Sequence, residues 1–418
     1  MSNAKAFRPV YAGPAGEVQV ARDLVAVGAN GRTLWEFQPD LAHPLPNGTD
    51  LLLMPGRAPL ALDPGTGEAV AIEGARGPAF ALAAALPVGY TRLLTPAAED
   101  DGRGPDLPLF GYTAVAERGG RLFVAATRTD DPGPWAPGSF TPEALAASIA
   151  ERTREFPGNR VLAQLSRCAR EYHCRTAQNL FQRRGEAGLP AARHCNASCL
   201  GCISLQPAQC CPAPQSRLTF TPTERELSEL AAAHLSASPE AMVSFGQGCE
   251  GEPLTAAPLL AAVIRAVRRR TDGGVINLNT NAGLTAALDT LIAAGLNSVR
   301  VSLFSAVPSD YAAYHRPSGF CLADVEASLR LAVTRGVRTS LNLLVYPGFT
   351  DSPRQTQALI DLCRRTGLHQ LQLRNLNIDP RAAAVFLPRH ETPGILELLG
   401  TIRRELPGLA VGNYSRAC

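Results

Sequence analysis

The chain has 418 residues, of which 45% are hydrophobic and 18% are charged, and this composition excludes a disordered chain and supports more than one packed core. The formal net charge is only +3, which argues against a protein that coats nucleic acid. The first residues lack the pattern of a secretory signal, and the most apolar early stretch is short and broken by Gly and Pro, so we expect a cytoplasmic protein without a membrane partner. The 11 cysteines then favour metal or redox chemistry over a disulfide framework.

The first 140 residues predict a small β-rich accessory domain. Short apolar segments at 51–54, 112–116 and 121–125 alternate with Gly, Pro, Asp and Asn. A run rich in Pro and Gly at 132–138 has the composition of a linker. We therefore place a domain boundary near residue 140.

Residues 141–188 predict a helical connector. Thr141 and Pro142 are typical of a helix start, and Leu162, Leu165 and Ala169 follow at helical spacing. The same stretch is rich in arginine, which indicates either a solvated helical face or a site for an anionic partner. These arginines are Arg152, Arg154, Arg160, Arg167, Arg170, Arg175, Arg183 and Arg184.

Residues 189–418 predict an α/β domain in which short apolar strands alternate with longer amphipathic helices. We expect strands at 190–194, 242–246, 275–279, 299–304, 339–346 and 371–375. We expect helices at 223–236, 256–269, 284–294, 322–334, 353–366 and 392–406. Six successive βα units predict a parallel sheet covered by helices, as in a full barrel, a partial (β/α)6 barrel or an open doubly wound sheet.

The densest chemical signal is a group of three cysteines, Cys195, Cys199 and Cys202, directly after the first expected strand. Three thiolates at this spacing can share one loop around a compact soft centre. Three cysteines on a cubane iron–sulfur cluster leave one iron free for another ligand, whereas a structural zinc normally takes four. Cys210 or Cys211 would supply that fourth ligand in a non-catalytic zinc-binding interaction protein, which is the alternative reading.

The cysteine spacing resembles the cluster motif of the radical S-adenosylmethionine (radical SAM) enzymes. After the second strand, residues 248–254 are similar to the Gly-Gly-Glu-Pro motif of that family, with Glu250 in place of the first Gly. After the third strand, residues 279–282 resemble its Thr-Asn-Gly segment, with Ala282 in place of Gly. All these residues fall where strands end, the face on which α/β barrels assemble active sites, and this placement agrees with a catalytic function. The resemblance implies a partial (β/α)6 barrel.

The resemblance implies a [4Fe-4S] cluster on Cys195, Cys199 and Cys202, with S-adenosylmethionine bound at its free iron. One electron, supplied by a reductant protein as partner, would cleave the cofactor to a 5′-deoxyadenosyl radical that abstracts hydrogen from a substrate. The substrate class stays open between a small molecule, a peptide and RNA. Gly201 departs from the family, because an aromatic residue often stands there against the adenine; Ile203 or residues 341–346 would have to replace it.

By the same resemblance, the cofactor contacts lie at the ends of several strands, at Gly251, Glu252, Asn279, Asn281 and Ser302. Each polar side chain among them has a structural alternative. The glutamate is also suited to a helix N-terminus, the asparagines to helix caps, and the serine to a buried strand hydroxyl.

Arg374, in the last expected strand, is a further candidate. Its planar guanidinium can clamp an anionic substrate or the cofactor carboxylate, although a structural ion pair explains it as well. Asn377 and Asp379 are candidates of the same kind.

The remaining cysteines form no compact motif. Six of them suffice for an auxiliary cluster or are free buried thiols, namely Cys168, Cys174, Cys210, Cys211, Cys249 and Cys418. Cys249 stands beside the expected cofactor contacts and could face the substrate. Cys321 and Cys363 lie on or beside expected helices, and we expect both in the core.

Overall fold

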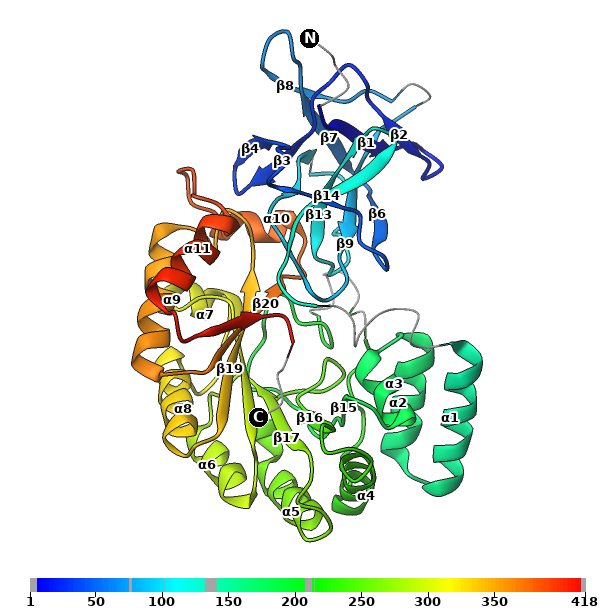
Figure 1. Ribbon diagram of the computed structural model, residues 1–418, viewed down its shortest axis with the longest axis vertical. Helices are drawn as coiled ribbons and strands as arrows, with labels where there is room; N and C mark the ends of the chain where they lie inside the picture. The colour runs from blue at the N-terminus through cyan, green and yellow to red at the C-terminus, as the bar shows by residue number, and fades with distance from the viewer. Residues whose placement is uncertain are drawn as a thin grey trace. The chain divides into compact units, whose positions relative to one another are not determined.

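The computed structural model describes residues 6–74, 77–100, 102–131, 141–206, 213 and 215–414. Its elements are drawn in Figure 1. The chain divides into two compact units, of which the first comprises residues 1–132, 344–360 and 373–407. The second comprises residues 133–343, 361–372 and 408–418. Within the described residues, no helix combines the length and the apolar character that crossing a membrane requires.

The N-terminal part is β-rich, as the sequence predicts. Its strands are short: β1 Arg8–Ala12, β2 Val18–Val20, β3 Val27–Asn30, β4 Thr33–Glu36, β5 Ala42–Pro44, β6 Asp50–Met54, β7 Arg57–Leu62, β8 Ala69–Ala71, β9 Phe80–Ala85, β10 Tyr90–Arg92, β11 Thr95–Pro96, β12 Ala98–Asp100, β13 Tyr112–Arg118 and β14 Arg121–Arg128. The main sheet has the order β10-β14-β13-β1-β9-β6, with β2 and β5 beside it. Two three-stranded sheets, β11-β3-β4 and β12-β7-β8, complete the fold.

The core of this part follows the two-residue period of its strands. One cluster packs Val10 and Ala12 of β1 against Leu82 and Ala84 of β9. Ala81 and Ala83 of the same strand point to the opposite face of β9 and belong to a second cluster. The strand is therefore buried on both faces, which explains its uninterrupted apolar sequence.

Three helices form the connector: α1 Pro142–Glu155, α2 Arg160–Glu171 and α3 Arg175–Gln182. Several of its arginines pair with glutamates. Arg160 reaches Glu226 at 2.7 Å, and Arg167 pairs with Glu171 one helical turn away at 2.7 Å. These two side chains are about half exposed, as on a solvated helical face, and an anionic partner of this stretch stays a prediction.

A seven-stranded sheet follows, with the order β15-β16-β17-β18-β19-β20-β21 and parallel pairing. Its strands are β15 Glu186–Gly188, β16 Met242–Phe245, β17 Val275–Thr280, β18 Ser298–Leu303, β19 Arg338–Val345, β20 Gln370–Asn375 and β21 Ala410–Gly412. Its helices are α4 Glu224–Leu235, α5 Ala257–Arg268, α6 Thr285–Ala294, α7 Pro308–His315, α8 Leu322–Thr334 and α9 Pro353–Thr366, with the 3₁₀ turn η4 Pro253–Ala256. The chain is therefore an α/β protein, and its closure into a partial barrel stays a prediction.

The ends of the expected sheet differ from what the sequence predicts. The first strand is Glu186–Gly188 rather than 190–194, and residues 190–194 form an irregular segment instead. An additional strand, β21, pairs with β20 beyond the last expected strand. Both strands have only three residues, which is too short for a recognisable apolar period.

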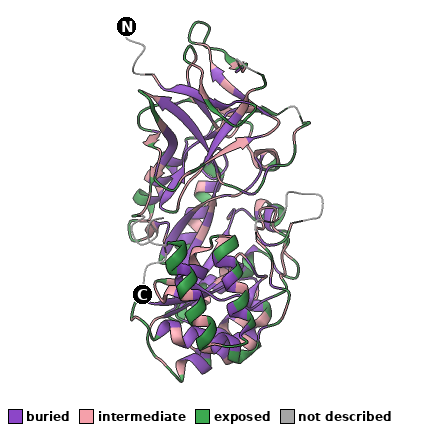
Figure 2. Ribbon diagram, turned by 90° about the vertical axis from the view of Figure 1, so that its right-hand side faces the viewer, coloured by how far each residue is buried: buried purple, intermediate pink, exposed green. Residues whose placement is uncertain are grey.

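The two faces of this sheet differ in polarity. Val243, Leu278, Val299 and Leu341 are fully buried on one face. Residues of the other parity include Ser244, Asn277 and Arg300. Figure 2 shows buried strands and helices whose outward surfaces are exposed. The apolar side chains therefore pack under the helices, and the polar side chains line the opposite face.

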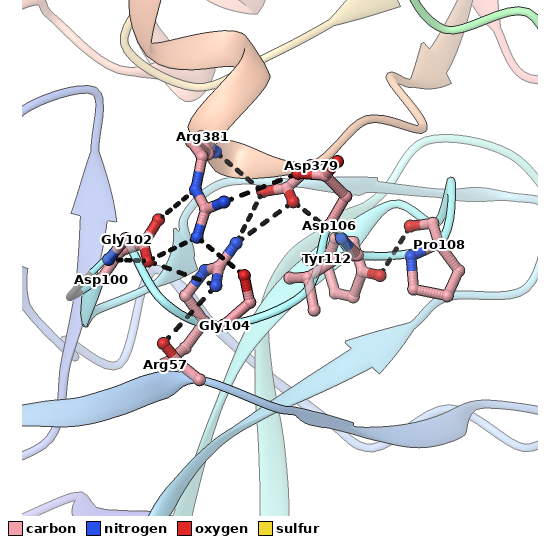
Figure 3. Close-up of polar contacts among 11 residues, drawn as sticks. Arg57, Asp100, Gly102, Gly104, Asp106, Pro108, Tyr112, Asp379 and Arg381 are labelled. Carbon is pink, nitrogen blue, oxygen red and sulfur yellow. Dashed lines mark hydrogen bonds and ion pairs between the residues drawn. The ribbon is translucent and has the colours of Figure 1, made fainter. Parts of the chain in front are cut away.

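A buried ionic network joins the C-terminal segment 373–407 to the N-terminal strands within the first unit (Figure 3). Arg57 donates to Asp379 at 3.2 Å, and both side chains are buried. Asp379 also accepts the backbone N–H of Leu107 at 2.8 Å and of Arg381 at 2.8 Å. The segment contains α10 Pro380–Ala383, η5 Ala384–Phe386 and α11 Ile395–Glu405. Asp379 thus acts as a structural anion here.

Arg92 makes a second connection inside the same unit. Its side chain is fully buried and donates to the carbonyl oxygens of Tyr112, Val345 and Leu376 at 3.0 to 3.2 Å. The guanidinium carbon lies 4.8 Å from the ring centre of Tyr346. Burial lowers the pKa of Arg92 to about 10, so the side chain stays charged at neutral pH.

Arg57 also pairs with Asp100 at 3.3 Å, which extends the network to the side chain that Arg381 contacts. We expect Asp379→Ala to lower the free energy of unfolding by about 3–5 kcal/mol, because the buried Arg57 loses one of its two carboxylate partners and the backbone N–H groups of Leu107 and Arg381 lose their acceptor. Urea unfolding followed by circular dichroism measures this loss. Glu397→Gln is the control, since its pair with Arg404 is exposed and solvent screening leaves such a pair with little effect on stability. Equal losses in the two variants would contradict the role of the buried pair.

The same network predicts acid sensitivity. Hydrogen bonding from Arg381 is the main cause that lowers the pKa of Asp100 to about 2. Because an aspartate in the unfolded chain titrates near ~3.9, this stabilisation is complete above that pH and is lost as pH falls towards 2. The melting temperature of the wild type should therefore fall more steeply between these pH values than that of Asp100→Asn. Parallel melting curves for both proteins would refute this assignment.

Candidate active site

The three cysteines lie on the irregular segment that follows β15. Cys195, Cys199 and Cys202 are half-buried free thiols. One side of their loop is bonded to the loop after β16, because Glu252 donates its backbone N–H to the carbonyl of His194 at 2.8 Å. Gly251 lies so close that a Cβ there would stand 2.0 Å from the same carbonyl oxygen. Only glycine fits at this contact between the two loops.

The opposite side of the cysteine loop is bonded to the end of α7. The backbone N–H of Ser198 donates to the carbonyl of His315 at 3.1 Å, and that of Leu200 donates to Tyr314 at 3.1 Å. The ring of Tyr314 stacks on Phe304, with centroids 4.3 Å apart. The loop is thus fixed between two segments that come from different strand ends.

His315 connects this aromatic group to the central cysteine. Its Nε2 accepts the backbone N–H of Phe304 at 3.2 Å, which assigns the ring proton to Nδ1. Nδ1 then donates to Cys199 Sγ at 3.3 Å. Burial lowers the pKa of His315 to about 3, so this donor is a neutral imidazole. No role for His315 was expected from the sequence.

The thiols influence one another electrostatically. Burial is the main cause that raises the pKa of Cys199 to about 12, and the neighbouring Cys195 and Cys202 contribute to this rise. Burial likewise raises the pKa of Cys195. Unliganded Cys195 and Cys199 are therefore protonated, and binding to a metal centre would release their protons. Among the described residues, no three His, Cys, Asp or Glu side chains converge closely enough to hold a single metal ion.

Glu252 connects the loop after β16 to the end of β17. One carboxylate oxygen accepts the hydroxyl of Thr280 at 2.5 Å and the backbone N–H of Leu254 at 3.0 Å. The other accepts the backbone N–H of Asn281 at 2.7 Å. Burial raises the pKa of Glu252 to about 7, against the effect of these three donors. Glu252 caps η4, as the structural alternative proposed, and the oxygen that accepts only the N–H of Asn281 keeps a second lone pair for a ligand.

Glu250 occupies the position where the resemblance places glycine, and sequence reasoning assigned it no role. Its carboxylate is buried and accepts four backbone N–H groups. Two come from Ala191 and Ala192 at 2.7 and 2.8 Å, and two from Gly246 and Gln247 at 2.6 and 2.8 Å. A single side chain thereby joins the segment after β15 to the loop after β16.

The two predicted asparagines have different surroundings. Asn281 is buried and donates to Asn196 at 2.7 Å, and its own oxygen accepts the backbone N–H of Gly283. The amide nitrogen of Asn196, next to the first cysteine, is buried without a hydrogen-bond partner. Asn279 accepts from Asn277 at 3.2 Å. The cap position of α6 belongs to Leu284, so neither predicted asparagine caps that helix.

Ser302 and Arg374 are half-buried on β18 and β20. Ser302 stands opposite Asn342 in the parallel pairing of β18 with β19. Arg374 belongs to the first unit, together with residues 373–407. Cofactor contacts for these two residues stay predictions.

The other cysteines fall into three groups. Cys168 and Cys249 are buried and share a hydrogen bond, and Cys174 acts electrostatically on Cys249. Cys363 is buried in α9 as expected, but Cys321 is exposed before α8, so its expected place in the core is wrong. Its side chain stands at a helix N-terminus, where water reaches it. Cys210, Cys211 and Cys418 lie outside the described residues, and so does most of the expected linker.

Comparison with protein families identifies the segment that carries this site. Residues 189–360 match the family model of the Radical SAM superfamily. The chain contains a radical SAM domain. It is an enzyme of this class, whose members generally use a [4Fe-4S] cluster and S-adenosylmethionine. Among curated proteins, none matches the chain.

Three solved structures are similar to the radical SAM domain and its surroundings. Methylornithine synthase (PylB) matches with 12% identity and a TM-score of 0.39, over 66% of this chain and 72% of PylB. Streptococcus suis SuiB bound to S-adenosylmethionine matches with 12% identity and a TM-score of 0.38, over 66% of this chain and 62% of SuiB. HydG, a maturase of the [FeFe]-hydrogenase, matches with 14% identity and a TM-score of 0.39, over 66% of this chain and 63% of HydG. The match thus spans less than two thirds of SuiB and of HydG.

The residues of the radical SAM domain fit the groups that its family uses. Three thiols on one fixed loop are soft ligands of the kind that iron–sulfur clusters take, and a cubane binds each thiolate at a different iron. The unpartnered amide of Asn196 and the buried carboxylate of Glu252 stand beside this loop. An acceptor and a donor are thus available for a zwitterionic ligand.

We expect Glu250→Gln to destabilise the radical SAM domain by about 2–6 kcal/mol. A carboxamide has only one acceptor oxygen, so two of the four buried N–H groups would lose their partner at about 1–3 kcal/mol each. Urea unfolding of the unliganded protein measures the loss. The exposed Glu240→Gln should stay within about 0.5 kcal/mol of wild type, and a Glu250→Gln variant that does the same would contradict this interpretation.

Proposed function

We propose that this enzyme binds a [4Fe-4S] cluster through Cys195, Cys199 and Cys202 and binds S-adenosylmethionine beside it. The observation that carries the proposal is the fixed cysteine loop, which is bonded to the Glu252 segment on one side and to the His315 segment on the other. A loop held at both sides presents its thiols with little loss of conformational freedom on binding.

The polar groups around the loop would bind the methionine end of the cofactor. Glu252 would accept its ammonium group, because the carboxylate is already aligned by Thr280 and Asn281. Asn196, whose amide nitrogen has no partner, would donate to the carboxylate of the cofactor. Gly251 would let the two loops approach closely enough to form the site. Asn279 and Ser302 would contact the ribose.

When bound, a reduced cluster would supply the electron for reductive cleavage of S-adenosylmethionine, the radical chemistry by which enzymes of this class abstract hydrogen from a substrate. The residues of this chain would bind the cluster and the cofactor and would adjust the reduction potential of the cluster. His315 donates a hydrogen bond to the sulfur of Cys199, and such bonds to cluster sulfurs adjust the reduction potential. A one-electron reductant protein would be the physiological partner.

We expect the anaerobically reconstituted wild type to contain iron and acid-labile sulfide and to release 5′-deoxyadenosine from S-adenosylmethionine with dithionite. Cys199→Ala should lose this release together with most of the iron, because it removes one of three cluster ligands. Metal analysis and chromatography of the products measure both quantities. Cys321→Ser is the matched control, since its thiol is exposed outside the site and serine is a favoured residue at a helix start.

Two results would overturn the proposal. One is a colourless wild type with stoichiometric zinc and no iron, which the zinc-binding alternative predicts. The other is undiminished release of 5′-deoxyadenosine from Cys199→Ala.

A further inference from the structure

Arg217 lies on a segment that is bonded to both loops of the proposed site. The backbone N–H of Gln215 donates to the carbonyl of Ile203, just after the third cysteine, at 3.3 Å. The backbone N–H of Leu218 donates to the carbonyl of Cys249, on the loop after β16, at 2.7 Å. These two bonds hold the backbone of Arg217 between the two loops, and its side chain is half-buried there.

The guanidinium of Arg217 is aligned by the hydroxyl of Ser204, which is buried. Its Nε and Nη2 donate to Ser204 Oγ at 3.1 and 3.0 Å. The same hydroxyl donates its own proton to the backbone carbonyl of Glu250 at 3.2 Å. Two N–H groups on one acceptor fix the direction of the planar guanidinium, because its donors form a rigid fork.

The aligned guanidinium contacts a proposed cluster ligand. Nη2 carries a second N–H and lies 3.6 Å from Cys202 Sγ, to which it donates. Its positive charge also acts on Cys195. The donor to Cys199, in contrast, is the neutral imidazole of His315. Arg217 therefore brings a full positive charge to the sulfur of one of the three cysteines.

A positive charge at this place favours the reduced state of a metal centre bound to these sulfurs. Reduction adds one negative charge to the centre and its thiolates, and net charge and hydrogen bonds to the sulfurs set the potential of iron–sulfur clusters. Arg217 would stabilise the added charge. Because the guanidinium is half-buried, water and salt screen it less than they screen an exposed side chain.

We propose that Arg217, aligned by Ser204, raises the reduction potential of the cluster through its charged hydrogen bond to Cys202. This inference rests on the proposed function, because it requires a cluster on the three cysteines. Arg217 acts through a ligand of the cluster and is therefore a positioning residue. Its loss should lower the potential and leave the affinity for S-adenosylmethionine unchanged.

Anaerobic redox titration of the reconstituted protein, followed by electron paramagnetic resonance, measures the potential without turnover. Arg217→Gln should decrease the equilibrium constant of one-electron reduction about ten-fold, equivalent to a potential about 59 mV more negative, because it removes a charged hydrogen bond. Arg217→Lys keeps the charge and should recover most of this loss. Calorimetric titration of the oxidised proteins with S-adenosylmethionine should give the same dissociation constant for both variants and the wild type.

Arg193→Gln is the matched control, because it removes an arginine charge from an exposed position on the segment before the first cysteine. Screening of an exposed charge should keep its equilibrium constant of reduction within about two-fold of the wild type.

Ser204→Ala is a second test that leaves Arg217 and all three cysteines in place. It removes the acceptor that aligns the guanidinium and should decrease the equilibrium constant of reduction about three-fold, half of the effect of Arg217→Gln on a logarithmic scale. This variant decides the question if Arg217→Gln takes up too little cluster for a titration.

A wild-type potential in Arg217→Gln and Ser204→Ala would overturn this role of Arg217, and so would an equal shift in Arg193→Gln. Weaker binding of S-adenosylmethionine at an unchanged potential would also overturn it and would assign Arg217 to the cofactor. Iron and sulfide content of the same samples separates these results from failure of the proposed function. A wild type without iron refutes the cluster and this inference together, whereas a loaded wild type and variants of equal potential refute only the role of Arg217.

Discussion

Backbone N–H groups bound to two buried carboxylates hold the carboxyl ends of the first three strands of the parallel sheet in one arrangement. Glu250 accepts four such groups from two loops, and Glu252 joins the second of these loops to the end of β17. An unpaired buried N–H is costly, so the loops cannot separate without a large loss of stability. These hydrogen bonds also fix the position of the cysteine loop. The proposed cofactor site is therefore a consequence of how the strand ends satisfy their backbone hydrogen bonds.

Much of the α/β part could be predicted from the sequence. The helices α8 and α9 match their expected bounds, because their apolar residues repeat at the helical period and their ends carry clear signals. The cysteine spacing and Glu252 were recognisable because their residue types are uncommon in that order. The short strands β15 and β21 were not, since three residues contain no period.

Contacts between distant residues explain the rest of what sequence reasoning missed. The roles of Glu250 and His315 depend on the loops that fold against them, and no local pattern reports such a contact. The ionic network of Arg57 and Asp379 joins residues more than 300 positions apart. The sequence does not show this pairing, so Asp379 was interpreted as a candidate ligand of the substrate. Such long-range contacts also explain why the N-terminal strands and segment 373–407 belong to one unit.

The direct test of the central claim is the electron paramagnetic resonance spectrum of the reduced, reconstituted protein, recorded before and after addition of S-adenosylmethionine. A cluster held by Cys195, Cys199 and Cys202 leaves one iron for the cofactor, so the g-values should shift when the cofactor binds. The account predicts this shift in the wild type. A cluster signal that S-adenosylmethionine leaves unchanged would contradict it, because all irons would then be closed to the cofactor.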